Sequence, residues 1–251
     1  MIDLHSHLLP GVDDGSKSVE QTLPVLERFA ADGVTILVLT PHLVASQVAK
    51  APYERNLAIL EELRSVAPLS IDLRLGWEIM LDEPKKDLRS PHLALGGSKA
   101  VLVEFPRLGV PVSAGDELYR IRCSGLVPVL AHPERYWGCT VDRVAEWRDA
   151  GAVMQMDTDG LMGRGPISKL SRMLVQEGLV DLFSSDNHGD SRSLATARDW
   201  LLEISTPDHA DLLTRANAQR LLDGDVLLPV PPLPAAGGIF GRLRELFLSR
   251  R

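Results

Sequence analysis

The chain has 251 residues, of which 45% are hydrophobic and 24% are charged, so it can bury a sizeable core. Its formal net charge of -7 argues against binding nucleic acid through overall charge. Two cysteines, Cys123 and Cys139, are too few for a disulfide framework or a thiolate zinc site. No apolar run reaches the ~18–20 residues that span a bilayer, and MIDLHSH has no signal-peptide pattern. We therefore expect a reduced, cytoplasmic protein.

Short apolar runs alternate with longer amphipathic stretches along most of the chain. The runs predict strands at Ile2–His7, Thr35–Thr40, Ile71–Glu78, Ala100–Glu104, Val127–Ala131, Val153–Asp157 and Leu182–Ser185. The stretches predict helices at Val19–Ala31, Tyr53–Val66, Ala114–Cys123, Val141–Asp149, Ile167–Glu177, Leu194–Ile204 and within Pro207–Leu222. This alternation is typical of βα units with a parallel sheet, and about seven units favour a closed α/β barrel over an open sheet.

The C-terminal part differs in composition from the rest. We expect one barrel domain over residues 1–226, a Pro- and Gly-rich linker over 227–238, and a separate tail over 239–251. The tail, IFGRLRELFLSRR, combines helical apolar spacing with net positive charge. Two interpretations stay open for it: a helix that folds onto its own or a neighbouring subunit, or a weak, reversible anchor for an anionic membrane surface.

Histidines at the ends of the predicted strands carry the chemical information. His5 and His7 lie two residues apart on the first strand, so their imidazoles point to the same side. Asp186 and His188 repeat this spacing after the last strand. The carboxyl ends of barrel strands converge on one mouth, which gathers the residues of ligand type there. They are His5, His7, Asp14, His42, Glu78, Glu104, His132, Asp186 and His188.

So many imidazoles and carboxylates in one place are costly unless cations accompany them. Ligation by nitrogen and oxygen without thiolate suits Zn, Mn or Fe and does not select among them. Three divalent ions would exceed the charge of four carboxylates by about two units, which favours a dianion such as a phosphate monoester. The sequence therefore predicts a metal-dependent phosphoesterase.

Six motifs resemble the PHP superfamily of metal-dependent phosphoesterases, and within it the bacterial capsule-type (CpsB-like) tyrosine-protein phosphatases. They are DLHSHLLPGVDDGS, TPHL, GWEI, VEFP, LAHPERY and SSDNH, spread over residues 3 to 188. The resemblance implies a distorted (β/α)7 barrel whose nine residues named above hold three metals, commonly manganese or iron. Asp14 stands where many PHP enzymes outside this group have histidine, which favours the capsule-type group.

The same resemblance implies a substrate and a location. The substrate would be phosphotyrosine in the tail of a bacterial tyrosine kinase that controls polysaccharide synthesis or export. The protein would be cytoplasmic, with peripheral contact at the inner membrane face through residues 239–251.

Two arginines are candidate phosphate ligands. Arg135 in HPERY would bind phosphate oxygens through its planar fork, and a surface ion pair with Glu134 is the alternative. Arg192, just beyond His188, is the second candidate. We expect Asp13 to structure its loop, Trp77 to pack in the core, and His92 and His209 to lie at the surface.

Other mechanisms lack their motifs. A cysteine-dependent phosphatase needs Cys-x5-Arg, and Val129 and Ala145 stand where that arginine would be. The MDTDG stretch departs from an aspartyl-phosphate motif at Leu161, and no lysine matches the bridging lysine of amidohydrolases. A nuclease is disfavoured because no basic track accompanies the site. A small-molecule phosphatase, such as one acting on histidinol phosphate, and a catalytically silent metal-binding module remain as rivals.

Overall fold

The computed structural model describes residues 1–233, so the predicted tail and the end of the predicted linker lie outside the described residues. Nine strands form two sheets in this part of the chain, and every pairing is parallel. The smaller sheet has the order β1 (Ile2–Asp3), β2 (Ile36–Leu39), β4 (Asp72–Leu75). The larger sheet runs β3 (His42–Val44), β5 (Glu78–Met80), β6 (Ala100–Glu104), β7 (Val127–Ala131), β8 (Val153–Asp157), β9 (Leu182–Ser184).

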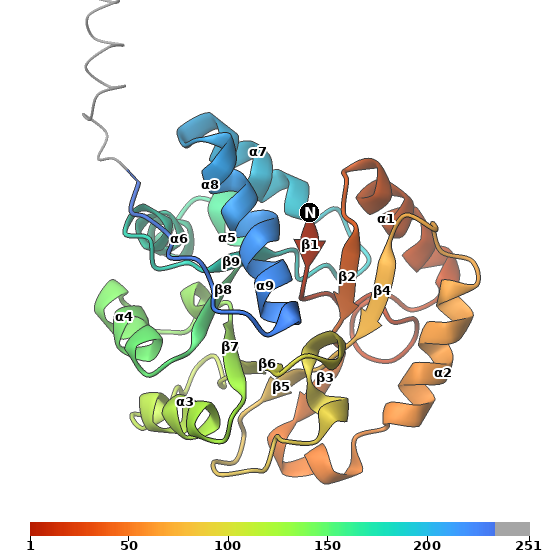
Figure 1. Cartoon of the computed structure of the whole chain (residues 1–251), viewed down its shortest axis with the longest axis horizontal. Helices are drawn as coiled ribbons and strands as arrows, with labels where there is room; N and C mark the ends of the chain where they lie inside the picture. Colours follow the sequence, from red (N-terminus) through yellow and green to blue (C-terminus); the bar gives the residue numbers. More distant parts are fainter. Residues whose placement is uncertain (234–251) are drawn as a thin grey trace, which may run out of the picture.

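Helices cover the outer side of these strands, and the strands follow one another around α9 in the view of Figure 1. Four helices have the predicted limits: α1 (Val19–Ala31), α3 (Ala114–Cys123), α4 (Val141–Asp149) and α7 (Leu194–Ile204). The others are α2 (Tyr53–Arg64), α5 (Thr158–Met162), α6 (Pro166–Gln176), α8 (Pro207–Asp211) and α9 (Asn217–Asp223). Short 3-10 turns lie at Ala45–Lys50, Pro91–Leu93, Leu95–Gly97 and Pro133–Arg135, and a π turn lies at Leu212–Ala216.

Two predicted strands differ clearly from the structure, and one observed strand was not predicted. The predicted strand Ile71–Glu78 is two strands, β4 and β5, which belong to different sheets. They separate at Gly76, where an added Cβ would lie within 3.0 Å of Leu95 and Val38. β3 was not predicted, since only two residues separate it from the end of β2. Only Ile2–Asp3 of the first predicted strand is paired as a strand. The breaks between β2 and β3 and between β4 and β5 change the direction of the chain just before His42 and Glu78.

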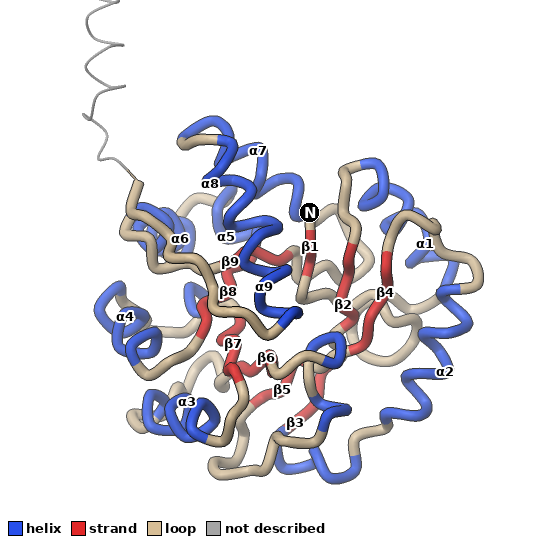
Figure 2. The backbone as a smooth tube through the Cα atoms, in the orientation of Figure 1, coloured by secondary structure: helices blue, strands red, loops and turns tan. Residues whose placement is uncertain are grey.

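The two sheets meet through backbone hydrogen bonds beyond their strands. Ser6 and Asn187 form a parallel bridge, and the Asp186 amide donates to the His5 carbonyl at 3.0 Å. On the other side, the chain itself joins the sheets, because β2 leads into β3 and β4 leads into β5 with two residues between the strands of each pair. The strands themselves remain two sheets, so the structure shows an α/β fold of parallel strands with outer helices (Figure 2).

The space enclosed by the strands is apolar at one end and polar at the other. The apolar end is filled from strand starts and closed by α9, and its members include Ile2, Leu102, Val129, Leu182, Ala218 and Leu221. A larger hydrophobic cluster lies between the strands and the outer helices. The polar end follows the strands' carboxyl ends and holds the buried His5, His7 and His132. The fold thus separates the apolar end, which we call the floor, from the polar end that carries the candidate ligands.

The C-terminal residues within the described part run along the domain surface. The Asn217 side chain bonds the Leu228 backbone, Val230 is buried, and the Leu233 amide donates to the Gln176 carbonyl at 2.9 Å. Within residues 1–233, the structure has no helix of the length and apolarity needed to cross a bilayer. The division of the chain into domain, linker and tail stays a prediction.

Leu221→Ala tests the floor. Removing this buried side chain should cost about 2–4 kcal/mol of unfolding free energy, through lost burial and a residual cavity. Urea denaturation measures the loss. Leu202→Ala on α7, where the leucine is half-exposed, is the control and should change stability by less than ~1 kcal/mol. Equal losses in the two variants would contradict this account of the floor.

Candidate metal centre

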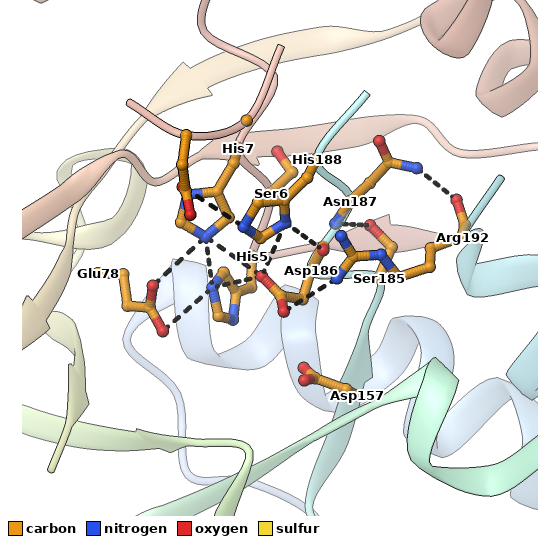
Figure 3. A network of polar contacts seen from close by, with 12 residues as sticks. His5, Ser6, His7, Glu78, Asp157, Ser185, Asp186, Asn187, His188 and Arg192 are labelled. Carbon is orange, nitrogen blue, oxygen red and sulfur yellow. Dashed lines mark hydrogen bonds and ion pairs between the residues drawn. The ribbon is translucent and has the colours of Figure 1, made fainter. Parts of the chain in front are cut away.

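The structure brings all nine predicted ligand residues together. Within residues 1–233, they form four overlapping groups in which the offered ligand atoms lie within 4.8 Å of one another: His7/Asp14/His42/His188, His5/Glu78/His132, His5/His7/Asp186 and His42/Glu78/Glu104. Figure 3 shows His5, His7, Glu78, Asp186 and His188 pointing toward one another. Because His5, His7, His42 and Glu78 each belong to two of these groups, the nine residues form one continuous cluster.

Glu78 lies at the centre of the cluster. Its two carboxylate oxygens lie 2.8 Å from His132 Nε2 and 2.8 Å from His42 Nδ1. His5 and His7 approach the same carboxylate at 3.4 and 3.3 Å. Burial disfavours its ionised form, yet the surrounding imidazoles hold the pKa of Glu78 well below its ordinary value. Glu78 is therefore a buried carboxylate that needs positive charge around it.

Asp186 joins the cluster to the arginines. It lies 3.3 Å from His5 Nε2 and 3.2 Å from His7 Nε2, while its other oxygen lies 2.8 Å from Arg135 and 3.2 Å from Arg192. Its backbone has φ 47°, a left-handed conformation that is uncommon outside glycine. His132 shares this feature with φ 36°. Such conformations concentrate at functional sites, where the surroundings fix them.

The chemistry of the donor set fits divalent metal ions. His5 Nε2 and His7 Nε2 face each other at 3.1 Å, and the buried Nδ1 of His132 has no hydrogen-bond partner in the described residues. Against the effect of burial, Glu78 and Asp157 raise the pKa of His132 to about 9. The carboxylates thus favour a cation among the imidazoles. Nitrogen and oxygen donors without thiolate can bind Zn, Mn or Fe.

One side of the cluster opens to solvent. Asp14 and His42 are exposed there and approach each other at 3.2 Å, and His188 lies 3.6 Å from Asp14. Asp13 occupies the loop position expected of it. Its carboxylate lies 2.7 Å from His7 Nδ1 and accepts from the Gly15 amide at 3.0 Å and the His42 amide. It thereby orients His7 from outside the cluster.

Several supporting residues were missed by sequence reasoning. Gln155 Oε1 lies 3.0 Å from His5 Nδ1, and its amide donates to Asp157 on the same face of β8. Buried Asp3 accepts from the amides of His5 and Ser185, so it holds the first and last motifs together. The i, i+2 spacing of Gln155 and Asp157 on a predicted strand is the signal that could have found them.

The two candidate arginines point to the same edge of the cluster. The described ion-pair partners of Arg135 are Asp157 and Asp186, so the alternative of a surface pair with Glu134 is wrong. Arg192 pairs with Asp190 and reaches Asp186. Both arginines line a cavity of about 670 Å³, together with Arg107 and Arg164. An anion in this cavity would meet several guanidinium groups.

Two further expectations have clear outcomes. Trp77 is buried, as predicted, and donates from its indole nitrogen to the His92 carbonyl at 2.9 Å. The expectation that His209 lies at the surface is wrong. It is buried on α8, with Nε2 lacking a partner in residues 1–233, and burial lowers its pKa. His92 is exposed.

Gly15→Ala tests how tightly the cluster is built. An added Cβ would lie 2.0 Å from the His7 carbonyl oxygen and 2.4 Å from His7 Cβ, both on the chain that carries a candidate ligand. We expect a stability loss of about 1–3 kcal/mol and reduced metal content, measured by thermal unfolding and elemental analysis. Gly115→Ala on α3, where the nearest atom is 4.0 Å away, is the control and should retain both. Normal metal content in Gly15→Ala would contradict this account.

Comparison with known proteins agrees with the resemblance seen in the sequence. A putative tyrosine-protein phosphatase CapC from Staphylococcus aureus is 29% identical over 197 residues, covering 75% of this chain and 77% of that protein. The tyrosine-protein phosphatase YwqE from Bacillus subtilis is 27% identical over 251 residues, covering 93% and 96%.

A solved structure gives the same result. It comes from work on YwqE from Bacillus subtilis and CpsB from Streptococcus pneumoniae, described as unique metal-dependent tyrosine phosphatases. It matches with a TM-score of 0.76 and 25% identity, covering 94% of this chain and 99% of that chain. The model of the family "Capsular polysaccharide synthesis, CpsB/CapC" matches residues 1–223. The fold and the cluster of histidines and carboxylates agree with this match. The chain therefore belongs to the CpsB/CapC capsular polysaccharide synthesis family.

Proposed function

We propose that this protein is a metal-dependent protein-tyrosine phosphatase. The observation that carries the proposal is one continuous cluster of five imidazoles and four carboxylates, with Arg135 and Arg192 both on Asp186 at its edge. Membership of a family whose relatives are named tyrosine-protein phosphatases supports it. The cluster supplies sites for cations, and the arginines supply a site for the anion beside them.

We also propose that the two sheets form one distorted (β/α)7 barrel. The Ser6–Asn187 bridge supports this arrangement, because it joins the segments that follow β1 and β9. The direct passage of the chain from β2 into β3 and from β4 into β5 supports it on the opposite side. In such a barrel the cluster lies at the carboxyl-end mouth, where barrel enzymes place their catalytic residues.

The nine residues of the cluster would hold three divalent ions, with manganese preferred and iron or zinc as alternatives. Such ions would polarise a phosphoryl oxygen and lower the pKa of water enough to supply a nucleophile near neutral pH. Asp13 and Gln155 would keep the rings of His7 and His5 in place. Metal identity and number are part of the proposal.

Arg135 and Arg192 would bind the non-bridging oxygens of the phosphoryl group. Each guanidinium has five N–H donors and is held by carboxylates, so donors remain for an anion. Asp157, Asp186 and Asp190 fix the planes of the two groups before substrate arrives. A preorganised donor stabilises charge that develops in the transition state without reorganisation at that moment.

A cysteine mechanism has no support in the structure. Cys139 lacks the arginine of a Cys-x5-Arg loop, and burial raises the pKa of its thiol to about 11. At neutral pH it is therefore a thiol and a poor nucleophile. Cys123 lies exposed on α3, away from the cluster residues in sequence and on a different element.

The proposed substrate is a phosphotyrosine-bearing protein, namely the tail of a bacterial tyrosine kinase that regulates polysaccharide synthesis or export. The family description, capsular polysaccharide synthesis, supports this choice. A small-molecule phosphomonoesterase of the histidinol-phosphatase type is the alternative. Contact of residues 239–251 with a membrane surface is a further part of the proposal and lies outside the described residues.

A comparison of substrates decides between these two functions. The proposal predicts a kcat/KM at least about tenfold higher on phosphotyrosine peptides than on phosphoserine peptides or histidinol phosphate, because the site serves an aryl phosphate on a protein. Steady-state phosphate release measures all three. A preference for histidinol phosphate would establish the alternative.

Glu78→Gln tests the metal assignment. The substitution keeps the shape but removes the charge that faces four imidazoles, so bound metal should fall and turnover of p-nitrophenyl phosphate should drop about 100-fold or more. Elemental analysis and steady-state kinetics measure the two effects. Glu146→Gln, at an exposed position of α4, is the matched control. Full activity in verified metal-free protein would sink the assignment.

Arg135→Ala should damage catalysis more than folding. Loss of a preorganised donor to the phosphoryl group should cost roughly 3–4 kcal/mol in kcat/KM. Arg135→Lys should also be impaired, because an ammonium cannot replace the planar fork between Asp157 and Asp186. Kinetics with thermal unfolding separates the two effects. A kcat/KM within about threefold of wild type in both variants would exclude Arg135 from phosphate binding.

A further inference from the structure

An apolar groove adjoins the arginine-lined cavity and has Arg135 in common with the proposed catalytic residues. We define the groove by Leu108, Trp137, Ile167 and Leu170, which line a second cavity of about 610 Å³. The two cavities share Arg107, Arg135 and Ile167, so they are continuous. A substrate bound at the arginines would therefore extend into the groove.

Large apolar side chains stand exposed on a fixed backbone here. Trp137 is 78% exposed and Leu108 is 87% exposed. The Trp137 amide donates to the Arg107 carbonyl at 3.0 Å, which ties the two loops together. The neighbouring Tyr136 hydroxyl accepts from the Phe105 amide and donates to the Ala131 carbonyl. An exposed tryptophan with an anchored backbone is typical of a binding anchor, since little order is lost on contact.

A buried carboxyl group completes the lining. Glu134 is 2% exposed, and its Oε1 accepts from the Asp157 amide at 3.1 Å. Its Oε2 is buried and has no partner within residues 1–233. Glu134 belongs to the cavity lining, but its Oε2 is itself covered by other atoms. The groove therefore offers an occupant mainly apolar contacts, from side chains such as Trp137 and Leu108.

We propose that this groove binds an aromatic residue of the substrate protein that lies next to the phosphotyrosine in sequence. The inference rests on the proposed function and specifies its substrate class. Aromatic rings pack well against Trp137, whose exposed side chain offers a large apolar contact area. Arg107 and Arg164 form no ion pair within the described residues, so they complement the negative charge of the phosphorylated segment.

The groove would act on binding rather than on the chemical step. A small aryl phosphate fills the arginine-lined cavity only, whereas a peptide fills both cavities. Loss of the groove should therefore raise the KM for a peptide and leave kcat nearly unchanged. The protein would then distinguish phosphotyrosine within an aromatic-containing segment from the same phosphotyrosine among small residues.

The test uses pairs of phosphotyrosine peptides that differ in one residue. One member has tyrosine within two positions of the phosphotyrosine, on either side, and the other has glycine there. Wild-type protein should favour the tyrosine member about tenfold in kcat/KM in at least one pair. Trp137→Ala should reduce that ratio to about one through KM, with turnover of p-nitrophenyl phosphate within about threefold of wild type. Leu108→Ala is the second variant and should reduce the ratio in part.

Tyr119→Ala provides the matched control, because Tyr119 is an exposed aromatic residue on α3 that lines neither cavity. It should keep the wild-type ratio. A wild-type ratio near one in every pair, or an unchanged ratio in both groove variants, would overturn the proposal. So would a concentration-dependent increase in mass that Trp137→Ala abolishes, since the occupant would then be a second copy of the chain. Absence of turnover on every phosphotyrosine peptide would overturn the proposed function itself, and the groove assignment with it.

Discussion

The buried carboxylate of Glu78 is the constraint on which the site depends. Four imidazoles approach it within 3.4 Å, and they come from the segments after β1, from β3 and from the end of β7. A buried charge is tolerated only with compensating charge, and here that compensation comes from residues far apart in sequence. The breaks between β2 and β3 and between β4 and β5 place His42 and Glu78 in this arrangement. The positions at which the strands break thus determine which side chains join the cluster.

Asp186 connects the imidazoles to the two arginines proposed to bind the substrate phosphate. One of its oxygens faces His5 and His7, and the other faces Arg135 and Arg192. One carboxylate therefore links the imidazoles of the cluster to both guanidinium groups. This connection explains why a phosphoryl anion and cations would bind next to each other in a chain of net charge -7. The overall charge says little about a local field of this kind.

Much of the site could be predicted from the sequence, because residues at successive strand ends must converge at one edge. All nine candidate ligands come together for this reason. The break at Gly76 could not be predicted, since the apolar run continues through Trp77 into Glu78 and reads as one strand. The burial of His209 was also missed, because it depends on how α8 packs against α7 and the π turn at Leu212–Ala216. The local sequence pattern indicates the periodicity of a segment, but it does not show which segments pack against it in the folded protein.

The central claim is that the nine clustered residues hold divalent metal ions. Anomalous X-ray diffraction from crystals of the active protein, recorded on both sides of the manganese, iron and zinc absorption edges, tests it most directly. The account predicts anomalous peaks within the cluster, at about 2.0–2.3 Å from imidazole nitrogens and carboxylate oxygens, with Glu78 and Asp186 among the ligands. Active crystals with no anomalous peak in the cluster, or with metal only elsewhere, would contradict it.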